Sequence, residues 1–143
     1  MKTSSDIILV SRLYEAYDPF PPLFGDRPVS LEEVLGATML TTDRPRLDIS
    51  DRQFHLGRVK YLLGCFQSWK PLSKRYYLRM DPIVVDYGWD RLVPTGPILV
   101  DGHHRFCAAI LGDVPKIRAD FSGPVKDIRY FMGRRNTRPD FIL

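Results

Sequence analysis

The chain has 143 residues, of which 44% are hydrophobic and 27% are charged, and its formal net charge is +4. This length is enough for one domain with a buried core, and the composition excludes a disordered or fibrous protein. No segment is long and apolar enough to span a membrane or to act as a secretory signal, so we expect a cytoplasmic protein with no membrane partner. Two cysteines, Cys65 and Cys107, make neither a disulfide framework nor a zinc motif and are expected as buried free thiols.

The charge is unevenly distributed along the chain. Residues 1–51 carry five basic and nine acidic side chains, whereas residues 52–143 carry sixteen basic and eight acidic ones. The C-terminal two-thirds therefore produces a positive field that suits anionic partners. Nucleotide phosphates and nucleic acid would both satisfy it.

The N-terminal part, residues 1–50, contains three recognisable elements. Residues 6–10 form an apolar run that predicts a buried strand. Residues 18–25 are rich in proline, which lacks an amide donor and fixes φ, and they predict an extended loop. Residues 30–33 form a capping box that predicts a short helix. Its inner face would comprise Leu31, Val34 and Leu35.

A second capping box, Ser50 to Gln53, precedes the strongest helical pattern of the chain. Apolar residues then recur at helical spacing and predict a helix over residues 51–66. Gly57 and Gly64 would either weaken this helix locally or permit close packing. The residues predicted to face the core are Leu56, Val59, Leu62, Leu63 and Phe66.

The C-terminal half alternates strands with helices. Residues 82–86 and 97–100 predict a hairpin whose long loop is punctuated by glycine and proline. A helix over residues 103–112 and an alternating strand over residues 116–121 follow. A basic tail, residues 124–143, includes a short amphipathic piece.

These elements together predict one mixed α/β (α+β) domain over residues 1–143. We expect a small mixed sheet flanked by helices, with the long helix covering one side of the sheet and the 103–112 helix near its edge.

Residues 101–105, with the sequence Asp-Gly-His-His-Arg, are the most informative segment. A strand that turns through Gly102 into a helix leaves N–H groups without intrahelical partners, and such a corner favours phosphate. The amides of Gly102, His103 and His104 would donate to it, and Arg105 would hold it with two hydrogen bonds. His104 could also act as an acid–base catalyst, and Asp101 could hold Mg²⁺ or orient a histidine.

The same five residues also fit a purely structural role. Asp101 is a good N-cap, and an aspartate four residues before Arg105 forms an ordinary helical pair. The neighbouring side chains of His103 and His104 point about 100° apart, which does not suit a shared metal ion. His55 is expected as a solvated helix residue. The local pattern alone leaves both interpretations equally open.

The segment from Pro82 to Ala109 resembles the core of the ParB/sulfiredoxin superfamily. Members carry a Pro-Ile-x-Val strand, a loop, and a second strand that ends in a Gly-x-x-Arg or Gly-x-His-Arg turn before an alanine-rich helix. The resemblance covers residues 80–121 and leaves residues 1–50 as a variable N-terminal part. In partition ParB proteins the turn contacts CTP phosphates, in sulfiredoxins it contacts ATP phosphates, and in free-serine kinases a similar turn serves phosphoryl transfer.

The resemblance implies a site for a nucleoside triphosphate, ATP or CTP, with Mg²⁺. Gly102, His104 and Arg105 would then bind phosphate, and Asp101 would serve as a metal ligand or acid–base residue. Glu32 is a candidate base by comparison with the kinase-like members. His103 stands where sulfiredoxins carry their reactive cysteine, which argues against peroxiredoxin repair. Too few residues follow the last strand for the helix-turn-helix domain of a partition protein.

Residues 66–79 combine four positive charges with aromatic rings and no acidic residue. Rings expected to be exposed, Trp69, Tyr76 and Tyr77, would stack on bases of single-stranded nucleic acid while cations track the backbone. In the alternative, the rings pin a loop to the core and the charges are merely solvated. The same two interpretations apply to the tail arginines. The candidate nucleic-acid contacts are Trp69, Lys70, Lys74, Arg75, Arg79, Arg134 and Arg135.

Three functions remain open from the sequence. The first is a nucleotide-binding domain with NTP hydrolysis or phosphoryl transfer at residues 101–105. The second is a ParB-like nuclease or DNA-binding protein of a phage or mobile element, in which His104 assists hydrolysis of a bound DNA phosphate. The third is a non-catalytic interaction protein. A homodimer is compatible with each.

Overall fold

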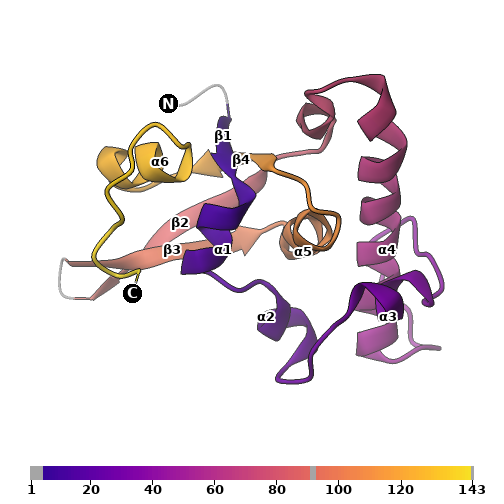
Figure 1. The fold of residues 1–143 in the computed structure, drawn as a ribbon. Helices are drawn as coiled ribbons and strands as arrows, with labels where there is room; N and C mark the ends of the chain where they lie inside the picture. The colour runs from indigo at the N-terminus through magenta and orange to yellow at the C-terminus, as the bar shows by residue number, and fades with distance from the viewer. Residues whose placement is uncertain (1–4, 91–92, 143) are drawn as a thin grey trace.

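The structure, a computed structural model, describes residues 5–90 and 93–142 and contains one mixed sheet (Figure 1). Its strands are β1 (Asp6–Leu9), β2 (Ile83–Asp90), β3 (Val93–Asp101) and β4 (Lys116–Phe121). The strand order is β1-β4-β2-β3, with β4 antiparallel to β1 and parallel to β2, and with β2 antiparallel to β3. The mixed α/β fold class predicted from the sequence is confirmed.

Helices pack on this sheet and on one another. Those of the described residues are α1 (Val10–Ala16), α2 (Phe20–Phe24), α3 (Leu31–Leu35), α4 (Asp51–Trp69), α5 (His103–Leu111) and α6 (Val125–Phe131), with the short 3-10 helices η1 (Lys70–Leu72) and η2 (Tyr76–Arg79). Within the described ranges, no helix combines the length and apolarity needed to cross a membrane.

The long helix α4 does not cover the sheet, which corrects the sequence-based arrangement. It packs mainly on α5, which lies between α4 and the strands (Figure 1). The residues of α5 explain this position, because Phe106, Cys107, Ala108 and Ala109 are all buried. A helix that is apolar on more than one side is stable only when it is enclosed. The core therefore has three layers at this end: the sheet, α5 and α4.

Both predicted serines cap their helices, but the Glu33 carboxylate, which would complete the first capping box, accepts from Arg52 instead. The Ser30 hydroxyl accepts a hydrogen bond from the Glu33 amide at 3.1 Å, and the Ser50 hydroxyl accepts one from the Gln53 amide at 3.2 Å. In α3, however, only Val34 is buried, while Leu31 and Leu35 are exposed. All five core residues predicted for α4 are buried, and the helix continues to Trp69.

Residues 18–25 are not an extended loop. Helix α2 occupies Phe20–Phe24, with Pro21 and Pro22 in its first turn. Proline is tolerated there because the amide that it lacks would have no intrahelical partner. Helix α1 follows β1 directly and was not predicted; it buries Val10 and Leu13.

Gly57 permits close packing, and Gly64 does not contribute in this way. A Cβ atom at Gly57 would collide with the Thr38 carbonyl oxygen and lie 2.8 Å from Leu40 Cγ. The Leu40 amide donates to the Gly57 carbonyl at 3.1 Å, so the chain before α4 is bound directly to the helix backbone. At Gly64 the nearest atom, Met39 Cε, would be 3.9 Å away.

The β2–β3 hairpin is confirmed, but its strands are longer than predicted. Gly88, Pro94 and Gly96 lie within the strands, with a register irregularity between Gly88 and Trp89. Residues 91–92 of the expected loop lie outside the described residues. Pairing extends to Asp101 opposite Val84, which places the end of β3 beside the start of β2.

A candidate nucleotide site at the start of α5

The predicted strand–glycine–helix corner is present between β3 and α5. Gly102 has φ +95°, and a Cβ atom there would lie 2.6 Å from Ile83 Cγ2 and 3.1 Å from Ile83 Cα. Both the backbone angle and the space therefore require glycine. The first intrahelical bond runs from the Phe106 amide to the Gly102 carbonyl at 2.9 Å, so the amides of residues 103–105 precede the hydrogen-bonded helix.

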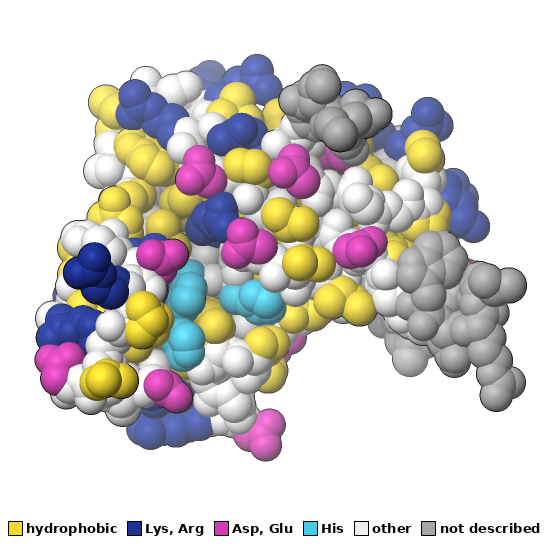
Figure 2. Space-filling model, turned by 180° about the vertical axis from the view of Figure 1, so that it is seen from behind, with side chains coloured by type: hydrophobic (Ala, Val, Ile, Leu, Met, Phe, Trp, Pro, Cys, Tyr) yellow, Lys and Arg dark blue, Asp and Glu magenta, His cyan; other side chains and the backbone are white. Residues whose placement is uncertain are grey.

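A cleft with a volume of about 540 Å³ opens beside this corner. We use "the cleft" for the space between residues 101–105, helix α4 and the chain after η2. Figure 2 shows the histidines gathered on one face of the molecule, bordered by both basic and acidic side chains. The side chains that α4 contributes include Arg58, Tyr61, Cys65 and Trp69, and the segment at the end of η2 adds Arg79 and Asp81.

Arg105 is held at the edge of the cleft by two groups. Its Nη1 donates to the Pro82 carbonyl at 2.9 Å, and its Nη2 lies 3.3 Å from Asp101 Oδ2. The Arg105 side chain is 19% exposed, whereas that of Asp101 is 70% exposed. The helical pair expected from the structural interpretation therefore exists. A guanidinium carries five N–H donors, and Arg105 borders the cleft. The bonds to Pro82 and Asp101 therefore leave further N–H donors available to a ligand.

His104 forms a hydrogen bond with His55, a contact that was not predicted from the sequence. His104 Nε2 and His55 Nδ1 are 2.8 Å apart, so one nitrogen donates and the other accepts. Burial, with His55 and nearby arginines adding to the effect, lowers the pKa of His104 to about 4. Burial also lowers the pKa of His55, which is half-buried between the rings of Phe24 and Phe54 and not solvated as expected. His104 is consequently neutral at physiological pH.

His103 is similarly held on the other side of the corner. Its Nε2 lies 3.0 Å from the Tyr17 hydroxyl, in the segment after α1. Burial lowers the pKa of His103, and burial raises the pKa of Tyr17. The rings of His103 and His104 are thus oriented by separate partners, Tyr17 and His55.

Tyr17 and His55 were missed as neighbours of the candidate site. Tyr17 lies 86 residues from His103, and no local pattern links the two. A signal for His55 did exist in the sequence. The period that identified the core of α4 also aligns a second stripe, His55, Arg58, Leu62, Cys65 and Trp69, on one face. Most of that stripe lines the cleft.

The described residues contain no group of three or more histidine, cysteine, aspartate or glutamate side chains that could hold a metal ion. The carboxylates of Asp43, Asp81 and Asp101 nevertheless border the cleft. Mg²⁺ commonly takes only one or two protein carboxylates and completes its shell with water and substrate phosphates. Asp101 therefore fits a magnesium role only together with a bound phosphate.

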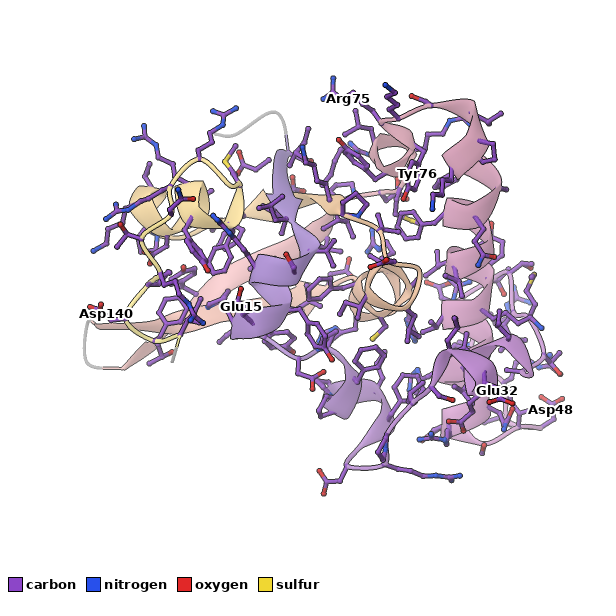
Figure 3. The ribbon with its side chains drawn as sticks, in the orientation of Figure 1. Glu15, Glu32, Asp48, Arg75, Tyr76 and Asp140 are labelled. Atoms are coloured by element: carbon purple, nitrogen blue, oxygen red, sulfur yellow. The ribbon has the colours of Figure 1, made fainter. Side chains whose placement is uncertain are left out.

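Glu32 is not brought to the cleft. It is an exposed residue of α3, at the lower right of Figure 3, and it does not line the space beside α5. Its neighbour Glu33 accepts two hydrogen bonds from the Arg52 guanidinium, at 2.9 and 2.6 Å. The α3 carboxylates thus have no geometric link to residues 101–105.

The basic aromatic stretch is divided between two surfaces. Trp69 and Arg79 line the cleft, whereas Lys74 and Arg75 line another groove together with Arg134. Tyr76 and Tyr77 are only 7% and 6% exposed, so the prediction that they stack on bases is wrong. Their rings anchor η2 in the core, in agreement with the alternative interpretation.

The two remaining candidates for nucleic-acid contacts lie apart from these surfaces. Lys70 is exposed at the start of η1 and lines neither the cleft nor that groove. Arg135 is exposed in the tail, where its carbonyl accepts a hydrogen bond from Arg12 at 2.8 Å.

The cysteines also differ from each other. Cys107 is fully buried in α5, and burial raises the pKa of its thiol. Cys65 is half-buried on α4 and lines the cleft. The expectation of buried free thiols is therefore confirmed for Cys107 alone.

Comparison of the chain with family models, with curated proteins and with solved structures finds no match. The resemblance of residues 82–109 to the ParB/sulfiredoxin core therefore stays a prediction from its motif. The geometry of the cleft is then the main basis for assigning a function.

Proposed function

We propose that the protein binds a nucleoside triphosphate in the cleft, with the phosphates at the start of α5. One observation carries this proposal: the residues that begin α5, from Gly102 to Arg105, line one cleft of about 540 Å³, and their amides precede the first intrahelical hydrogen bond. Unpaired amides at a helix start and a planar guanidinium are the groups that bind phosphate most commonly in proteins. The volume lies within the range of small-ligand sites.

Phosphate binding would rearrange the Asp101–Arg105 pair. At 3.3 Å, with the carboxylate mostly exposed, this is a weak surface ion pair that a multiply charged phosphate can displace. Arg105 would keep its bond to the Pro82 carbonyl and turn its free edge to the phosphate. The released Asp101 carboxylate would then be available to Mg²⁺ bound to the same phosphates.

The side chains that α4 contributes to the cleft suit the base of a nucleotide. Arg58, Arg79 and Arg105 balance the three carboxylates that also line the cleft, so that a bound phosphate would rely on Mg²⁺ for part of its neutralisation. Tyr61 and Trp69 add half-buried rings. Aromatic faces stack on nucleobases with little preference for the base, which fits either ATP or CTP. The motif resemblance to the ParB/sulfiredoxin core supports the same class of ligand.

The residues of the cleft favour binding over rapid turnover. Phosphoryl transfer needs positioning, charge neutralisation and a group that accepts a proton near neutral pH. His104, with a pKa of about 4, is a weak base, and Glu32 lies elsewhere. Neutral His104 instead suits the orientation of a phosphate oxygen or water, with His55 fixing which nitrogen carries its proton. We expect hydrolysis or phosphoryl transfer here to be slow.

The test is thermal unfolding with ATP, CTP, GTP and ADP, each with Mg²⁺. A ligand that binds only the folded protein at about 100 times its Kd adds about 2.7 kcal/mol to the free energy of unfolding. We expect at least one triphosphate to raise the midpoint, Arg105→Gln to abolish the rise, and Arg129→Gln, an exposed cation on α6, to leave it unchanged. Circular dichroism confirms that each variant is folded. The proposal fails if no triphosphate moves the wild-type midpoint.

A further inference from the structure

A second concave surface gathers four cations from separate parts of the chain. We call it the basic groove; it has a volume of about 770 Å³. Its cations are Lys74, Arg75, Lys116 and Arg134. Lys74 and Arg75 come from the link between η1 and η2, Lys116 begins β4, and Arg134 lies just after α6. Figure 3 shows Arg75 at the upper end of the molecule, far from Glu32 at the lower end.

The groove has a large excess of positive charge. All four cations are exposed. Among the described residues, Asp6 is the only carboxylate that also lines the groove. The nearby carboxylate of Asp120, outside the lining, accepts a hydrogen bond from the Ser5 hydroxyl at 3.0 Å. Like charges that converge without matching anions repel one another, and an anionic partner removes that cost.

The backbone at two of these positions is fixed. Gly133, with φ +81°, ends α6 in the left-handed conformation, and the Arg134 amide donates back to the Arg129 carbonyl at 2.9 Å. These are the features of a helix end that turns the chain sharply. The Arg75 amide donates to the Ser73 hydroxyl at 3.1 Å, which closes the turn that carries Lys74. The cations therefore extend from defined points on the two sides of the groove.

We infer that the basic groove binds the phosphodiester backbone of nucleic acid, independently of base sequence. A concave row of cations matches a chain of phosphates, whereas a flat membrane surface cannot enter it. Tyr77, the ring that lines the groove, is 6% exposed and offers no face for stacking on a base. The groove thus supplies backbone contacts without base readout.

The experiment is fluorescence anisotropy with a labelled DNA of about 20 nucleotides, single-stranded and as a duplex, over a range of salt concentrations. The test variant is Lys74→Gln/Arg75→Gln/Arg134→Gln. The matched control is Arg27→Gln/Arg44→Gln/Lys126→Gln, which removes the same charge from exposed residues outside the groove. Melting temperatures establish that both variants are folded.

We expect wild-type binding that weakens steeply with salt. In the test variant, affinity should fall at least about tenfold and the salt slope should flatten by about 2, since each lost phosphate contact removes about 0.7 to 0.9. The control should change affinity less than about threefold, as expected for rim charges. Arg105→Gln should have no effect, so the groove and the nucleotide site can fail separately.

Three results would overturn the inference. One is the absence of DNA binding by the wild-type chain at low salt. Another is an equal loss in the test and control variants, which would indicate a response to net charge alone. The third is equal or tighter binding to polyglutamate or to phosphatidylserine vesicles, which would assign the groove to an acidic protein or a membrane.

Discussion

The cleft and the basic groove both present arginine to an anion, but the chain holds them very differently. In the cleft Arg105 is mostly buried and bonded to Pro82, and His104 is bonded to His55. In the groove the side chains are exposed, and only the backbone behind them is fixed. The cleft can therefore select a ligand by shape, whereas the groove responds to charge. Substitutions in the cleft should alter stability, and those in the groove should not.

The largest effect should come from Gly102→Ala at the corner of the cleft. The new Cβ would meet Ile83 and would require a left-handed backbone, so we expect a loss of about 3 kcal/mol in the free energy of unfolding. Gly133→Ala is the comparison, because Gly133 also has positive φ but its added Cβ would meet only the end of the flexible Leu9 side chain, at 3.0 Å. It should lose only about 1 kcal/mol by urea unfolding. Equal losses would show that the corner is not sterically constrained.

A smaller effect is expected in α4, the opposite wall of the cleft. Gly57→Ala would press against the Thr38 carbonyl and Leu40 and should destabilise the protein by about 2 kcal/mol. Gly64→Ala meets only ordinary contact distances and should stabilise the helix by about 0.5 to 1 kcal/mol. Denaturant midpoints of the two variants should thus move in opposite directions. A stabilised Gly57→Ala would mean that the chain before α4 is not tightly bound to it.

Acid should destabilise the protein through His104 in the cleft. The pKa of His104 is about 4 in the folded protein and about 6.5 when unfolded, so the unfolded state binds more protons between these values. The free energy of unfolding should therefore fall as the pH falls through this window. With a discount for partial exposure, the His104 contribution is about 1 kcal/mol between about pH 7 and pH 5.

The comparison for this prediction is His104→Gln, which keeps a polar group beside His55. Urea unfolding at both pH values should show a smaller pH dependence in the variant than in the wild type. An unchanged dependence would mean that His104 is protonated as easily in the folded protein as in the unfolded chain.

The smallest effect on stability should come from the groove. The triple variant Lys74→Gln/Arg75→Gln/Arg134→Gln removes exposed charges that make no ion pair with a described residue. We expect its free energy of unfolding to stay within about 0.5 kcal/mol of wild type. A loss near that of Gly102→Ala would show that these cations have a structural role and would remove the contrast between the two surfaces.

Features that depend on short stretches of chain were predictable. Ser30 and Ser50 bond to amides three residues ahead, and Gly102 is required by a turn between adjacent elements. Such signals are complete within a few residues of sequence. The corner of the candidate site was therefore visible without the structure.

Features that depend on packing were not predictable. His55 and His104 lie 49 residues apart, and nothing local indicates their contact. The rings of Tyr76 and Tyr77 fit an exposed stacking surface or a buried anchor equally well, and only the core decides between them. Proline at the start of α2 likewise looks the same in an extended loop and in a first helical turn.

The most direct test is calorimetric titration of a triphosphate, with Mg²⁺, into the protein with and without saturating DNA. If the cleft and the groove are separate sites, we expect one triphosphate per chain, with the same affinity, in both titrations. The heat of triphosphate binding should disappear only in the Arg105→Gln variant. Two separate anion sites are contradicted if no triphosphate binds, or if DNA competes with it for the cleft.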